Sequence, residues 1–177
     1  MFHKILVCLD GSKSAERILP YVSSEARKFN AKVVLLHVST RDLPAYALPS
    51  AEPVRFIPIE LLFSASLERQ ARMKDYLNET AQRLRTEGLS VECVTVSGLA
   101  TDISDIIVRH ALENDVDLIA MVTRGFTGWR RLLYGSITDS VTRKSSLPVL
   151  TLRPGPGKGA ADSRSEFADD RMSVSTA

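Results

Sequence analysis

The sequence predicts an α/β protein with a single open five-stranded parallel sheet and helices on both faces. Short apolar runs rich in Val, Ile and Leu recur along the chain, as in strands that are buried on both faces. Longer segments with apolar residues at helical spacing alternate with these runs. Alternating strands and helices of this kind form parallel sheets, because each helical crossover returns the chain to the same end of the sheet.

The first strand, helix and second strand follow directly on one another. The apolar run Lys4–Leu9 predicts the first strand. Apolar residues then recur at helical spacing to about Phe29, and Ser12 or Ser14 is a suitable N-cap for this helix. The β-branched run Lys32–Val38 predicts the second strand, which completes a β-α-β unit.

A proline-rich segment follows the second strand. Four prolines between residues 39 and 59 exclude a regular helix or a central strand there. We expect a surface loop over 39–59, which is either a functional loop or a plain disordered insertion. The long charged helix Glu60–Glu87 comes next, with Gly88 in the position of a C-terminal cap.

The second half of the chain repeats the alternation. Val91–Val96 predicts the third strand, a helix follows over Ile103–Leu112, and Leu118–Val122 predicts the fourth strand. A short helix from Ser136 to about Lys144 then leads to the fifth strand, Pro148–Leu152. Beyond it the composition changes to Pro, Gly and small polar residues without apolar periodicity. We therefore expect one folded domain over 1–153 and a disordered tail over 154–177.

Composition excludes several classes of protein. Lys and Arg total 23 against 21 Asp and Glu, so overall charge gives no reason to expect nucleic acid or acidic membranes as partners. The first apolar run is too short for a signal peptide core or a membrane span, so we expect a cytoplasmic protein. Cys8 and Cys93 lie in apolar strands, which favours core packing over a disulfide or a metal site.

Two strand ends are candidates for ligand binding. In open parallel sheets, ligands bind beyond the carboxyl ends of the strands. Here Asp10–Ser12 follows the first strand, and the glycine segment Gly125–Thr138 follows the fourth and leads into the last helix. Free N–H groups at a helix start, with glycines beside them, favour an anion such as phosphate. Ser136 and Thr138 add hydroxyl donors.

Local charge also suits phosphate. Arg124, Arg130 and Arg131 lie between Met121 and Thr138 without an acidic residue among them. The alternative is that the glycine segment is only a turn and an N-cap, and that Asp10 likewise only caps the first helix. The sequence pattern by itself leaves both interpretations open.

Across residues 2–152 the chain resembles the universal stress protein family. The resemblance rests on several weak features that occur in the right order. They are Lys4–Val7 before Asp10–Ser12, Leu36–Val38, Gly98 before the third helix, Gly125 followed after nine residues by Gly135–Ser136, then Val141, and Leu147–Leu150. The fold that this resemblance implies is Rossmann-like and similar to that of adenine nucleotide alpha hydrolases.

The resemblance also implies a set of binding residues. The ATP-binding branch of the family carries G-x-x-G, nine residues, and then G-S or G-T. Val122 takes the place of the first glycine, and its side chain would either crowd the ribose and phosphates or point away from them. By position, Asp10 and Val38 would hold the adenosine end, and Met121 would line its pocket. The phosphates would be held by Gly125, Gly135, Ser136, Ile137 and Thr138.

The function implied is that of an ATP-binding stress-response or signalling module, with Mg or Mn bound through the phosphates and a homodimer formed through the fifth strand. The alternative is a nucleotide-free dimeric interaction protein of the same fold, which the valine at position 122 motivates. The chain has no complete P-loop, no G-x-S-x-G elbow and no carboxylate in a metal-binding motif. We therefore expect no catalysis beyond slow ATP hydrolysis at most.

Overall fold

The computed structural model describes residues 1–40, 59–123 and 137–153. They form one open five-stranded sheet in the order β3-β2-β1-β4-β5, and every pair of neighbouring strands is parallel. This confirms the predicted fold class. The strands are β1 (Lys4–Cys8), β2 (Lys32–Thr40), β3 (Val91–Gly98), β4 (Leu118–Val122) and β5 (Val149–Leu152).

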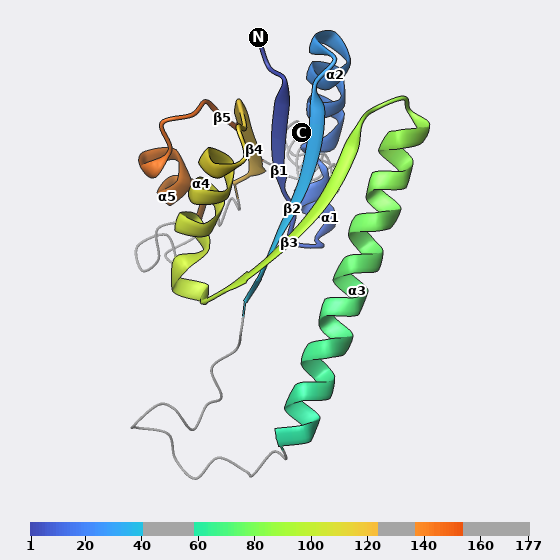
Figure 1. Ribbon diagram of the computed structural model, residues 1–177, viewed down its shortest axis with the longest axis vertical. Helices are drawn as coiled ribbons and strands as arrows, with labels where there is room; N and C mark the ends of the chain where they lie inside the picture. The colour runs from blue at the N-terminus through green and yellow to red at the C-terminus, as the bar shows by residue number, and fades with distance from the viewer. Residues whose placement is uncertain (41–58, 124–136, 154–177) are drawn as a thin grey trace, which may run out of the picture.

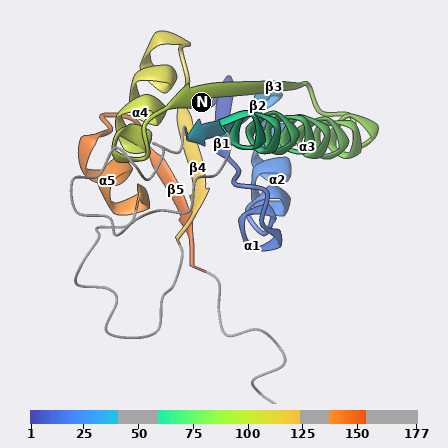
Figure 2. The same cartoon turned by 90° about the horizontal axis from the view of Figure 1, so that it is seen from below.

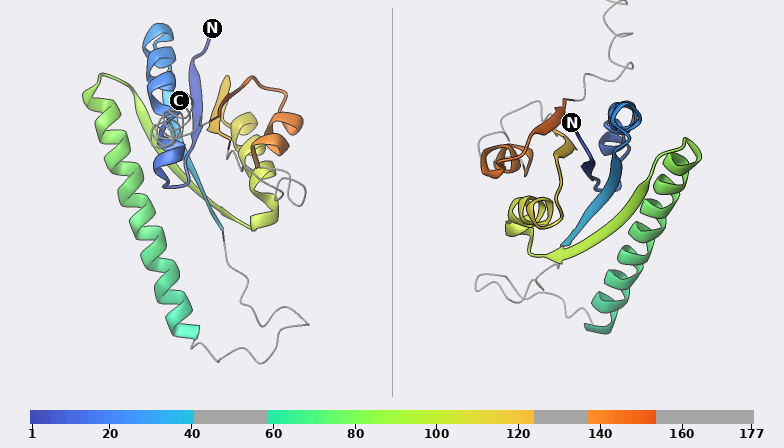
Figure 3. Two further views of the ribbon diagram at one scale, coloured as in Figure 1. Left: turned by 180° about the vertical axis from the view of Figure 1, so that it is seen from behind. Right: turned by 45° about the horizontal axis from the view of Figure 1, so that its top comes forward.

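Helices cover both faces of the sheet. Figure 1 shows α1, α2 and α3 on one side of β1 and β2, with α4 and α5 on the other, and the views in Figures 2 and 3 agree. The long helix α3 runs antiparallel to the strands, and its first turns extend past the carboxyl edge of the sheet (Figure 1). The helices are α1 (Lys13–Glu16), α2 (Leu19–Phe29), α3 (Ile59–Thr86), α4 (Ile103–Glu113), preceded by a 3₁₀ turn over Ala100–Asp102, and α5 (Ile137–Lys144).

The core has two halves, one on each face of the sheet. In β1, Ile5 and Val7 pack against α2 and α3, whereas Leu6 between them packs against α4 and α5. This alternation explains the unbroken apolar runs, because both faces of a central parallel strand are buried. We call these halves the α2–α3 face and the α4–α5 face.

The single helix expected before Phe29 is two helices. Pro20 lies in the first turn of α2, and α1 ends at Glu16. A continuous helix would bring the Pro20 ring against the carbonyl of Glu16 and leave that carbonyl without an N–H donor. The chain therefore breaks its helix and restarts, with the proline at a position where no N–H is needed.

The second and third strands are longer than the sequence pattern predicted. They pair as far as Thr40 opposite Gly98, so the first two residues of the expected loop continue β2. The remainder of that loop, 41–58, and the expected tail, 154–177, lie outside the described residues. Within the described ranges no helix combines the length and apolar character that crossing a membrane would require.

Candidate functional site

The strand order places a topological switch point between β1 and β4. The chain leaves β1 toward β2 on one side and leaves β4 toward β5 on the other, although β1 and β4 are neighbours. Connections that diverge in this way leave a crevice at the carboxyl edge of the sheet, which is the usual ligand position in this architecture. The predicted loops after the first and fourth strands both begin there.

The loop after β1 is held by its own side chains. The Oδ1 atom of Asp10 accepts a hydrogen bond from the backbone N–H of Ser12 at 3.0 Å and another from its hydroxyl at 2.6 Å. The Ser12 oxygen in turn accepts from the N–H of Ala15 at 3.1 Å and caps α1, as predicted for one of the two candidate serines. The exposed carboxylate of Asp10 therefore stands in a fixed orientation at the mouth of the crevice.

The second strand supplies a wall of the crevice because β2 and β3 extend beyond the last residue of β1. Cys8 pairs with Leu36, so the segment after Leu36 projects past the end of β1. Val38 lies on this projection, half-buried, opposite Val96 of β3. The Nδ1 atom of His37 lies 3.0 Å from the carbonyl oxygen of Leu9 and fastens the projection to the loop after β1.

Val38 and Met121 share the α4–α5 face of the sheet. Met121 is only 5% exposed and is therefore mostly a core residue that borders the crevice. Val38 is more accessible and packs at the edge of the same cluster. Together they form an apolar surface beside the Asp10 loop, of the kind on which a flat heterocycle packs.

The start of α5 closes the other side of the crevice. The N–H groups of the first turn of a helix lack acceptors within the helix, and α5 begins at Ile137, beside the end of β4. Thr138 is only 4% exposed, and its hydroxyl donates to the carbonyl oxygen of Val122 at 3.4 Å. The side chain of Thr138 therefore fastens α5 to the end of β4. Ile137, the first residue of the helix, is 43% exposed.

The valine at the first glycine position of the family pattern lies on the opposite face from Met121. The Val122 side chain packs against the α2–α3 face, whereas Met121 and Val38 belong to the α4–α5 face. Successive residues of a strand point to opposite faces, so the two side chains separate even though they are adjacent in the chain. Only the backbone of Val122 is presented toward the start of α5, through its bond to Thr138.

Sequence reasoning missed two residues of this edge. Asp139 lies in the first turn of α5, where the helix dipole favours a carboxylate, and it places a negative charge close to the proposed anion position. The role of His37 also emerges only from the structure. At the far end of α5, the Nζ atom of Lys144 donates to Ser104 at 3.1 Å and to Asp105 at 2.7 Å, which ties α5 to α4.

Three of the predicted phosphate residues, Gly125, Gly135 and Ser136, lie outside the described residues. In the ranges that are described, no group of three or more His, Cys, Asp or Glu side chains could hold a metal ion. Burial raises the pKa of the Cys8 thiol to about 12, which disfavours the thiolate, and the side chain packs against the α4–α5 face.

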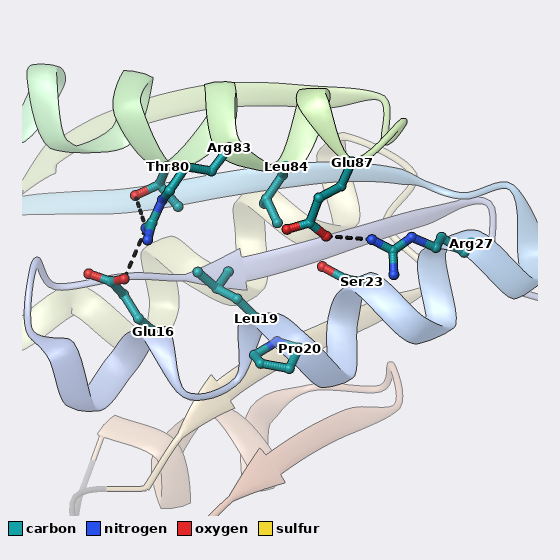
Figure 4. Close-up of a pocket in the computed structure, with 9 residues that line it drawn as sticks. All are labelled: Glu16, Leu19, Pro20, Ser23, Arg27, Thr80, Arg83, Leu84 and Glu87. Atoms are coloured by element: carbon teal, nitrogen blue, oxygen red, sulfur yellow. Dashed lines mark hydrogen bonds and ion pairs between the residues drawn. The ribbon is translucent and has the colours of Figure 1, made fainter.

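A second hollow lies away from this edge, between α1–α2 and α3. It has a volume of about 360 Å³, and Figure 4 shows that ion pairs cross it at two points, Glu16 with Arg83 and Arg27 with Glu87. Leu19 and Leu84 contribute apolar surface to it. Because the hollow lies on the α2–α3 side, it shares no lining residue with the crevice between β1 and β4.

Comparison with known proteins points to one family. The model of the universal stress protein family matches residues 1–153. The chain is 30% identical over 162 residues to universal stress protein MJ0577 of Methanocaldococcus jannaschii, which covers 86% of this chain and 96% of that one.

Solved structures agree on the fold. A universal stress protein in complex with cAMP superimposes with a TM-score of 0.61 at 22% identity, covering 87% of this chain and 98% of the other. A universal stress protein family member from Arabidopsis thaliana with AMP bound gives a TM-score of 0.60 at 17% identity, covering 89% and 98%. At these identities the likeness is one of fold.

Proposed function

This chain belongs to the universal stress protein family, and on that premise we propose that it binds an adenine nucleotide, ATP, in the crevice between β1 and β4 and acts as a stress-response or signalling module. The single observation that carries the proposal is the convergence at one edge of the Asp10 carboxylate, the apolar side chains of Val38 and Met121, and the N-terminus of α5. A carboxylate, an apolar wall and free N–H groups match the ribose or base, the adenine ring and the phosphates respectively. Proteins of the same fold that bind cAMP and AMP support this choice of ligand class.

Each proposed contact has a separate physical basis. Asp10 would accept a hydrogen bond from the adenosine, since its orientation is already set by Ser12. The ring would pack against Val38 and the accessible border of Met121. The phosphates would lie against the N–H groups of Ile137 and Thr138, together with those of the glycine segment. The further phosphate residues of this proposal are Gly125, Gly135 and Ser136.

A divalent cation, Mg or Mn, would be held by the phosphates themselves. The described part of the chain has no cluster of side chains suited to it, and a bound nucleotide brings its own oxygen ligands. The cation would supply charge neutralisation of the triphosphate. Affinity for the metal should therefore appear only together with the nucleotide.

We also propose the homodimer through β5. This strand is at the edge of the sheet, and Val149, Leu150 and Leu152 are only half-buried in the single chain. An apolar edge strand with unpaired N–H and C=O groups gains by pairing with a second copy. Light scattering coupled to chromatography should give twice the chain mass at micromolar concentration, and a monomer would contradict the proposal.

Thermal denaturation with ATP and Mg tests the nucleotide proposal. At a ligand concentration of 100 times Kd, binding adds about 2.7 kcal/mol to the free energy of unfolding. For a protein of this size that raises Tm by roughly 5–11 °C. No shift with millimolar ATP, and no nucleotide in the purified protein, would reject it.

A pair of Asp-to-Asn variants makes the test specific. Asp10→Asn keeps an oxygen for Ser12 but removes the charged acceptor, and a charge-assisted hydrogen bond contributes about 1.5–3 kcal/mol. We therefore expect the Kd for ATP to rise about 10-fold or more. Asp115→Asn is the control, because Asp115 is exposed at the opposite edge and its positive φ of 49° is one that Asn tolerates. Equal effects of both variants would contradict the assignment of Asp10.

A further inference from the structure

The loop that carries Asp10 is supported from behind by helix α3. Gly11 adopts a φ of +81°, and a Cβ atom on it would lie 2.9 Å from Cε and 3.7 Å from Sδ of Met73. Because the optimal separation of carbon atoms is about 3.5–4.0 Å, the end of the Met73 side chain occupies the space that a Cβ on residue 11 would need. The backbone of Gly11 therefore rests directly on the end of the Met73 side chain.

The helix backbone around Met73 is anchored because the next turns of α3 are buried. Leu77, one turn further along the same side of the helix, is 1% exposed, and Ala81 and Leu84 are equally part of the α2–α3 core. The turn before Leu77 cannot move independently of this buried stripe. The backbone of α3 at Met73 is thus fixed by the core, and the half-buried end of the Met73 side chain reaches the loop.

Helix α1, which follows the loop directly, is tied to the same helix. Figure 4 shows Arg83 and Thr80 of α3 directed at Glu16, with Arg83 Nη2 2.9 Å from the Glu16 carboxylate and 3.3 Å from the Thr80 hydroxyl. Arg83 is largely exposed, and exposed ion pairs contribute little to stability. The apolar contact at Gly11 is a second contact from α3, and it falls on the loop itself.

Helix α3 packs on the opposite face of the sheet from the apolar residues of the proposed site. The buried residues of α3 belong to the α2–α3 face, whereas Val38 and Met121 belong to the α4–α5 face. Met73 would therefore act on a nucleotide in the crevice through the backbone of Gly11 and the adjacent Asp10.

We infer that Met73 is a positioning residue for nucleotide binding: it holds Gly11, and through Gly11 the carboxylate of Asp10, in the orientation that receives the adenosine. The inference rests on the proposed function. Ser12 fixes the carboxylate within the loop, and His37 fixes the start of the loop at Leu9. Met73 supports the loop from α3, outside the sheet and the loop.

Three variants and one titration test it. Met73→Ala removes the support, Met73→Leu restores apolar bulk at that position, and Leu84→Ala is a control that truncates a more deeply buried residue of the same helix, away from the loop. We expect Met73→Ala to raise the Kd for ATP at least fivefold and Met73→Leu to stay within twofold of the parent. Leu84→Ala should lower Tm more than Met73→Ala and leave Kd within twofold.

The possible outcomes separate the two proposals. A parent that binds ATP with an unchanged Kd in Met73→Ala would overturn the positioning role alone. Equal loss of affinity in Leu84→Ala would also overturn it, since the effect would then follow stability. A parent that does not bind ATP would overturn the proposed function, and with it this inference.

The contact itself has an independent readout that needs no nucleotide. Gly11→Ala should lower Tm in the parent because of backbone strain and because its Cβ meets Met73. In the Met73→Ala background only the strain remains, so the same substitution should lower Tm by a smaller amount. Equal losses of Tm in both backgrounds would show that Met73 does not bear on Gly11 and would overturn the inference.

Discussion

Replacement of Val122 by Gly tests whether this departure from the family pattern matters for binding. The side chain packs on the α2–α3 face, away from Met121 and Val38. If that face carries no nucleotide contact, restoring the glycine should leave the affinity for ATP unchanged within about threefold. It should, however, reduce stability.

The loss of stability can be worked from the burial of the side chain. Full burial of a valine contributes about 1.5–3 kcal/mol, and Val122 is only partly buried, so roughly 1 kcal/mol is lost with it. Glycine within a strand lowers the free energy of unfolding by about 0.5–1 kcal/mol more, because of its backbone entropy. The total of about 2 kcal/mol corresponds to a Tm lower by roughly 4–8 °C for a protein of this size.

Calorimetric titration measures the affinity for ATP, and thermal denaturation of the same samples measures Tm. Val122→Ala is the matched control, because it removes the two methyl groups without the backbone freedom of glycine, and it should show about half of the loss in Tm. The reasoning is refuted if Val122→Gly binds ATP tenfold more tightly than the parent, or binds it where the parent does not. That result would favour the nucleotide-free interaction protein over the ATP-binding module.

Three further predictions concern the fold. In Gly98→Ala the new Cβ would lie 2.1 Å from Cδ1 of Ile106, which should lower the free energy of unfolding by about 1–3 kcal/mol. Ile106→Val removes that Cδ1 atom, so it should raise the midpoint of urea unfolding in the Gly98→Ala background. If the two substitutions instead lowered stability additively, the contact would be contradicted. Tyr76→Phe should keep or raise Tm, since the hydroxyl is buried without a hydrogen bond of good geometry to a described residue; a clear drop would reveal a partner. Backbone N–H donors lower the pKa of Asp117, so its stabilisation is present above the unfolded pKa of about 3.9 and disappears as the pH falls through the lower folded value. Asp117→Asn should therefore be less stable than the parent at pH 7, with the difference shrinking below about pH 4.

The strands and most helix bounds were predictable from the sequence because burial on both faces leaves a local signature. A run such as Leu118–Val122 is apolar at every position, which only a central parallel strand or a buried helix requires. The break at Glu16 was missed because the apolar spacing continues through it. Pro20 carried the signal, since a proline four residues after a helical carbonyl ends the helix.

The positions of the site residues were predictable only as far as the strand ends. Periodicity shows that Met121 and Val122 face opposite ways, but it does not show which face carries the ligand side. That depends on which helices cover each face, a long-range property. The same limit applies to Gly11 and Met73, whose contact joins segments far apart in the sequence.

The hydrogen bonds at the start of α5 suggest that the proposed nucleotide site has two separate parts, one for the phosphates and one for the nucleoside. The Thr138 hydroxyl is committed to Val122, and Asp139 places a carboxylate in the same turn, so this helix start offers phosphate its N–H groups and little side-chain attraction. On the proposed function, most of the side-chain attraction for phosphate would then come from the glycine segment and its arginines. The nucleoside end would depend on other residues, Val38 among them.

This division predicts how substitutions at the two ends should affect a series of ligands. Val38→Ala reduces the apolar wall, so it should weaken adenosine, AMP and ATP by the same factor. Gly135→Val should weaken ATP strongly and adenosine little, because a side chain there obstructs only the approach of phosphate to the backbone. Calorimetric titrations of both variants with the three ligands measure the factors. If Val38→Ala weakened ATP alone, the apolar wall between β2 and β4 would not be the nucleoside site, and the orientation proposed for the nucleotide would have to be reversed.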